Sequence, residues 1–144
     1  MTHEFLAGLQ RCNAENVWHI QQLLLFPSHE YPAYSAIHIL NYLQRHLTLM
    51  NTSVTFISFS AGVVGAIGAA WGWQMLGGTV KALVALDGWG VPLYGTFPIH
   101  RLSHDYFTHW SSALLGSVGS RFYADPPVEH LTLWEKPDSW HQGQ

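Results

Sequence analysis

The chain has 144 residues, 48% of them hydrophobic, which suits one domain with a substantial buried core. Six Lys and Arg stand against nine Asp and Glu, without a basic run interleaved with aromatic residues, so no nucleic-acid partner is expected. The single cysteine, Cys12, excludes an internal disulfide, and the first residues lack the pattern of a signal peptide. We therefore expect one cytoplasmic domain over residues 1–144.

Four elements are expected before residue 50, one of them a short helix with Asn13 as its N-cap that runs through Trp18 and Ile20. The range 4–9 (EFLAGL) indicates a short strand, and the apolar run 23–26 before Pro27 fits either a strand or a helix end. From Pro32, apolar residues recur every three or four positions, which predicts an amphipathic helix with Pro32 near its first turn. Its inward face is expected to contain Ala33, Ala36, Ile37, Leu40, Leu43 and Leu47.

The centre of the chain alternates between strand and helix. We predict strands at 54–59 and 81–86, with a helix over 61–76 between them that is closed by Gly77 and Gly78. Both strands are apolar on both faces, which is typical of a parallel sheet covered by helices on each side. The fold class is therefore α/β, a three-layer sandwich with a mostly parallel sheet of four or five strands. Further on, we expect a helix over 103–115 and a strand over 128–134.

The same central stretch has one competing interpretation. No charged residue lies between Arg45 and Lys81, which is enough uncharged chain for a membrane-spanning helix. Its many Ser and Thr residues and the β-branched, aromatic segment VTFISF favour strand followed by helix. No membrane association is therefore expected.

The most specific motif is Ser58-Phe59-Ser60-Ala61-Gly62, which departs from Gly-x-Ser-x-Gly only at its first position. In a nucleophile elbow, small residues flank a serine in a strained strand-to-helix turn, and the next N–H together with the helix N-terminus receives an oxyanion. The alternative is a small turn that only joins strand to helix. Four glycines in the following helix predict a bare face packed closely on the sheet: Gly62, Gly65, Gly68 and Gly72.

The segments ISFSAG, VKALVALDG and VEHLTLWEKPD together resemble the centre and the late strand of the α/β-hydrolase superfamily. The resemblance implies a truncated hydrolase core with Ser60 as nucleophile, Asp138 as acid, and the N–H groups of Ala61 and Leu9 as oxyanion hole. The whole chain is also similar to small cyanobacterial hydrolase-like proteins, which implies no defined substrate. In the family a histidine follows the acid after one further strand, yet only residues 139–144 follow Asp138.

A substitute base is therefore expected from the histidine-rich segment 100–109, with His104 the best candidate. Asp87, after the neighbouring strand, is the alternative acid, or else the first residue of an Asx-turn. His100 and His104 would share one helix face, a spacing that also suits a metal, but no metal or cofactor is expected because the Glu of His-Glu-x-x-His is absent.

Two functions remain open. One is an esterase or thioesterase-like serine hydrolase acting on a small apolar acyl group, favoured by Trp89, Tyr94 and Phe97. The other is a non-catalytic protein that keeps the hydrolase-like scaffold and perhaps a ligand pocket. A short sheet leaves edges that need cover, so a homodimer is expected.

Overall fold

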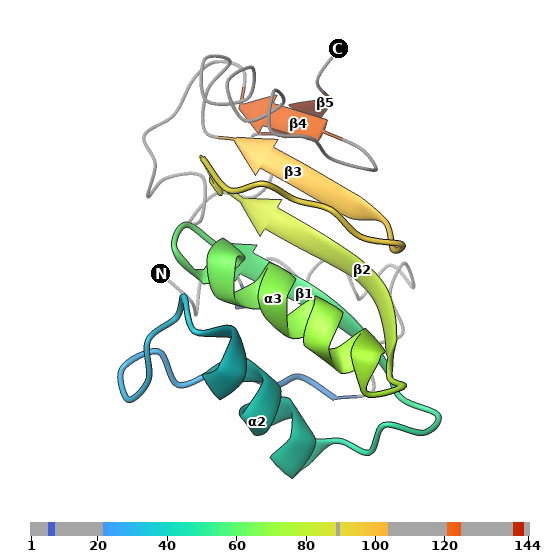
Figure 1. The fold of residues 1–144 in the computed structure, drawn as a ribbon. Helices are drawn as coiled ribbons and strands as arrows, with labels where there is room; N and C mark the ends of the chain where they lie inside the picture. Colours follow the sequence, from blue (N-terminus) through green and yellow to red (C-terminus); the bar gives the residue numbers. More distant parts are fainter. Residues whose placement is uncertain (1–5, 8–21, 89, 104–120, 125–139, 143–144) are drawn as a thin grey trace.

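The structure is a computed structural model that describes residues 6–7, 22–88, 90–103, 121–124 and 140–142. Its centre is the unit β1 (Ser53–Phe59), α3 (Gly62–Met75) and β2 (Thr79–Leu86), as predicted. Three further strands complete the sheet: β3 (Ile99–Ser103), β4 (Arg121–Ala124) and β5 (Trp140–Gln142). The strand order is β1-β2-β3-β4-β5, and only the β4–β5 pairing is antiparallel (Figure 1). The α/β class and the mostly parallel sheet are confirmed.

The helix expected from Pro32 is α2 (Ala36–His46), which begins several residues later than predicted. Ser35 is its N-cap, and the Ser35 hydroxyl accepts a hydrogen bond from the His38 N–H. Leu43 is buried as expected, but Ile37 is 71% exposed, and Ile39 packs against the core instead. The predicted inward face was therefore wrong at Ile37.

Gly65, Gly68 and Gly72 of α3 face α2 and the residues just before it, and not the sheet. A Cβ at Gly68 would lie 2.6 Å from the Ala36 Cβ, and one at Gly72 would lie 2.7 Å from the Leu40 Cδ2. A Cβ at Gly65 would collide with the Ala33 carbonyl oxygen. The predicted packing of this glycine face on the sheet is therefore wrong, because the close approach is between two helices. Figure 1 shows α2 beside α3 at the β1 end of the sheet, with α3 in front of β1.

The core lies between α3 and the sheet. On β1, Phe56 and Ser58 are buried, whereas Ile57 on the other face is 39% exposed. The burial of both faces that helices on each side of the sheet would give is therefore not seen at Ile57. Residues 53–75 form a strand and a helix, which excludes one continuous helix over this stretch. Within the described ranges, no helix has the length and apolar character needed to cross a membrane.

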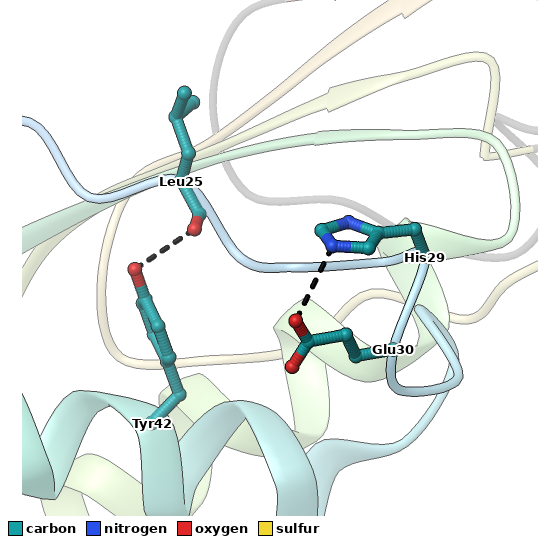
Figure 2. A network of polar contacts seen from close by, with 4 residues as sticks. All are labelled: Leu25, His29, Glu30 and Tyr42. Atoms are coloured by element: carbon teal, nitrogen blue, oxygen red, sulfur yellow. Dashed lines mark hydrogen bonds and ion pairs between the residues drawn. The ribbon is translucent and has the colours of Figure 1, made fainter.

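The structure differs from the elements expected in the N-terminal part of the chain. Leu6 and Ala7, the two described residues of the expected strand 4–9, are helical, in keeping with the high helix propensity of both residue types. Residues 22–27 form neither strand nor helix. The Tyr42 hydroxyl fixes this segment to α2, because it donates a hydrogen bond to the Leu25 carbonyl at 2.8 Å. Figure 2 shows this bond together with the exposed pair of His29 and Glu30.

Candidate active site

Ser60 occupies the strained turn that the motif predicted. It follows the last residue of β1 and precedes α3 by one residue, with a φ of 53°. A positive φ is unusual for any residue except glycine and persists only where neighbouring structure enforces it. Two hydrogen bonds do so here: the Ser60 N–H donates to the Leu86 carbonyl at 2.8 Å, and the Ser60 carbonyl accepts from the Val63 N–H at 3.1 Å.

Asp87 has the same position one strand further along. It follows the last residue of β2, has a φ of 51°, and its N–H donates to the Leu102 carbonyl of β3 at 2.7 Å. The register pairs Phe59 with Leu86, so the residues after this pair, Ser60 and Asp87, lie side by side at one end of the sheet. Asp87 is only 4% exposed, which makes it a buried carboxyl group beside the candidate nucleophile.

Ala61 is the residue expected to donate the oxyanion N–H. It is exposed, has helical dihedral angles and directly precedes α3. Among the described residues, no backbone carbonyl accepts a hydrogen bond from the Ala61 N–H, although the Ala61 carbonyl accepts from Val64. The N–H is thus available to a ligand next to the N-terminus of α3.

The two small residues that flank the turn have different roles. The buried Ser58 donates its hydroxyl hydrogen to the Val84 carbonyl at 3.2 Å, so it supports the β1–β2 pairing. At Gly62 an added Cβ would meet no atom within 4 Å. The expectation that Gly62 must be small to let strand and helix approach is therefore wrong.

One buried charged residue near this end of the sheet was missed from the sequence. Arg101 on β3 is 3% exposed, and its guanidinium donates to the Val91 carbonyl at 2.6 Å and to the Gly88 carbonyl at 3.4 Å. Arg101 is two residues after the apolar Ile99 and therefore on the same face of β3, and this spacing is the signal that could have indicated its burial. The strand itself was not predicted from the sequence.

No described histidine lies in the turn that contains Ser60. His38 and His46 are on α2, His29 is in the turn before it, and His141 is in β5. His100 is within β3, paired with Val84, so it cannot share a helix face with His104 as expected. Within the described part of the chain, no group of His, Cys, Asp and Glu residues is placed to hold a metal ion.

Several expected site residues lie outside the described residues: Leu9, Trp89, His104 and Asp138. The helical Leu6 and Ala7 also remove the strand on which the oxyanion role of Leu9 depended. Phe97 is 2% exposed and belongs to the core, so it is not available to a substrate. The Tyr94 carbonyl accepts a hydrogen bond from the Trp71 indole, more than two turns along α3 from Ser60.

Ser60 thus has a positive φ at the junction of β1 and α3, beside the buried carboxyl group of Asp87. Comparisons with protein-family models, curated proteins and solved structures found no match to this chain. Function is therefore argued from the site.

Proposed function

We propose that this protein is a serine hydrolase that cleaves esters or thioesters of small apolar acyl groups, built on an α/β-hydrolase-like three-layer sandwich. The observation that carries the proposal is the positive φ of Ser60 between β1 and α3. A strained turn at this place aims a side-chain oxygen out of the sheet toward a helix N-terminus, which is the presentation a nucleophilic serine needs.

In the proposed reaction, the Ser60 oxygen attacks the acyl carbon while its proton passes to a base. The Ala61 N–H, beside the N-terminus of α3, stabilises the negative charge that develops on the acyl oxygen. The leaving alcohol or thiol departs with the proton, and water then hydrolyses the acyl-enzyme with the same base.

The base we propose is His104, and the acid is Asp87. The carboxyl ends of β1, β2 and β3 meet at one edge of the sheet, and His104 follows Ser103, the last residue of β3. Neighbouring strands are about 4.8 Å apart, so Asp87 lies one strand spacing from Ser60. Asp87 is favoured over Asp138 because it is buried next to the nucleophile.

The apolar acyl preference is supported by Val64. It lies in the first turn of α3 and is 45% exposed, which leaves an apolar side chain near the serine turn. Phe97 and Tyr94, which suggested the preference from sequence, do not contribute. Among the described side chains of the turn, residues 60–64, none is charged.

The second candidate function is a non-catalytic protein with a hydrolase-like scaffold. The observation that favours it is the distribution of the described histidines, which lie in α2, in the turn before it, or in the strands β3 and β5. A serine without a base is a weak nucleophile.

The test is turnover of p-nitrophenyl acetate, butyrate and octanoate by the full chain. The proposal predicts hydrolysis with a pre-steady-state burst, fastest for the acetate or butyrate ester, and loss of the burst in Ser60→Ala. Equal background rates for wild type and Ser60→Ala with all three esters would favour the non-catalytic scaffold.

A further inference from the structure

The buried guanidinium of Arg101 holds a turn that lies outside the proposed chemistry. The ends of this turn, which follows β2, are Gly88 and Val91, and the Val91 N–H donates to the Gly88 carbonyl at 3.2 Å. Arg101 donates to the carbonyl groups of both of these residues. One side chain of β3 therefore fixes both ends of the turn.

The same stretch of β3 also holds Asp87. Leu102, the residue after Arg101, accepts the Asp87 N–H at 2.7 Å. On the other side, a Cβ at Gly88 would lie 2.7 Å from the Val63 Cγ1 on α3. The segment 87–88 is thus confined between β3 and α3, directly beside the Ser60 turn.

A physical reason supports a role for this arrangement. Burying a guanidinium is costly unless hydrogen bonds compensate for the lost hydration, and here the carbonyl groups of Gly88 and Val91 provide two of them, which ties β3 to this turn. Asp87 also has a positive φ, and such strain persists only where surrounding contacts enforce it.

We propose that Arg101 is a positioning residue: its guanidinium fixes Gly88 and Val91 through their carbonyl groups and so helps to hold Asp87 in its strained conformation beside Ser60. Arg101 does not touch the substrate. The catalytic consequence rests on the proposed hydrolase function. Lysine replaces arginine only in part, because a single ammonium group does not reproduce the planar guanidinium that donates to two carbonyls.

The experiment compares Arg101→Met, Arg101→Lys and Arg45→Met in the full chain. Arg45 is exposed on α2 and provides the matched control. Backbone amide exchange is followed by NMR for Asp87, Val91 and the residues of α3, and p-nitrophenyl butyrate hydrolysis gives kcat and KM.

We expect Arg101→Met to speed exchange at Asp87 and Val91 at least tenfold more than in α3, and to lower kcat at least tenfold with little change in KM. Arg101→Lys should lie between this variant and wild type, and Arg45→Met should match wild type. If Arg101→Met does not fold, the Arg101→Lys result decides.

Unchanged exchange at Asp87 and Val91, or faster exchange spread evenly over α3, would overturn the proposal. A wild-type protein without ester turnover would instead overturn the hydrolase function and, with it, the catalytic role of Arg101. The exchange measurement would then still decide whether Arg101 fixes the turn.

Discussion

Ser60 and Asp87 lie side by side at one end of the sheet and have nearly the same positive φ, 53° and 51°. Ser60 directly follows β1, and Asp87 directly follows β2, the strand paired with it. The N–H group of each donates to a carbonyl group of the next strand: Ser60 to the Leu86 carbonyl of β2, and Asp87 to the Leu102 carbonyl of β3. Two strained non-glycine residues side by side are a feature of functional sites more often than of simple connections.

The strained backbone at Ser60 predicts that the serine needed for the proposed function lowers the stability of the fold at this position. We expect Ser60→Gly to leave the free energy of unfolding unchanged or to raise it by up to about 1 kcal/mol, because glycine adopts a positive φ without steric cost. Urea unfolding followed by circular dichroism measures this change. A loss of about 2 kcal/mol would show that the Ser60 side chain serves mainly to hold the fold.

Ser58, which lies within β1 two residues before Ser60, is the matched control. Ser58→Gly removes the hydrogen bond to the Val84 carbonyl and loosens a buried strand residue. We therefore expect Ser58→Gly to lower the free energy of unfolding by about 1–2 kcal/mol.

The packing of α3 on α2 predicts a contrast between two glycines of one helix. Gly68→Ala should destabilise the fold by about 1–2 kcal/mol, because the new methyl group would overlap the Ala36 Cβ. The steric cost of this overlap should exceed the stability gained from the higher helix propensity of alanine. Gly62→Ala should be neutral or stabilising, since its Cβ would meet open space. Thermal unfolding of both variants checks the pair, and equal effects would contradict the helix–helix contact.

If Asp87 is the catalytic acid, substitution of Asp87 and substitution of Asp138 should have very different effects on kcat. Asp87→Asn should lower kcat for butyrate ester hydrolysis by roughly 10²–10⁴-fold, as loss of a triad acid does, whereas Asp138→Asn should change it less than about twofold. Asparagine tolerates a positive φ, so the backbone at position 87 is expected to persist. The reverse result would assign the acid to Asp138.

The β1–α3–β2 unit was predictable because its signals are local. Val54 to Phe59 is a β-branched and aromatic run of strand length, and Gly77 and Gly78 end the helix at the position expected from sequence. The strained turn at Ser60 was predictable for the same reason, since its motif lies within five consecutive residues.

What was missed depends on contacts between distant residues. Glycine spacing shows that a helix face is bare, but Gly68 does not reveal whether a sheet or a second helix approaches it. β3 was missed because His100 and Arg101 interrupt its apolar pattern. Hydrogen bonds to the carbonyl groups of Gly88 and Val91, far from Arg101 in the sequence, help to offset the cost of burying this guanidinium. Phe97 was misassigned because an aromatic residue after a strand fits a pocket or a core equally well.

The most direct test of the central claim is labelling of the full chain with a fluorophosphonate probe, followed by peptide mapping. The account predicts one labelled residue, Ser60, with labelling abolished in Ser60→Ala and strongly reduced in His104→Ala. His38→Ala, a change on the exposed face of α2, should label at the wild-type rate. Folded wild-type protein that remains unlabelled, or that is labelled at a serine other than Ser60, would contradict the assignment of Ser60 as an activated nucleophile.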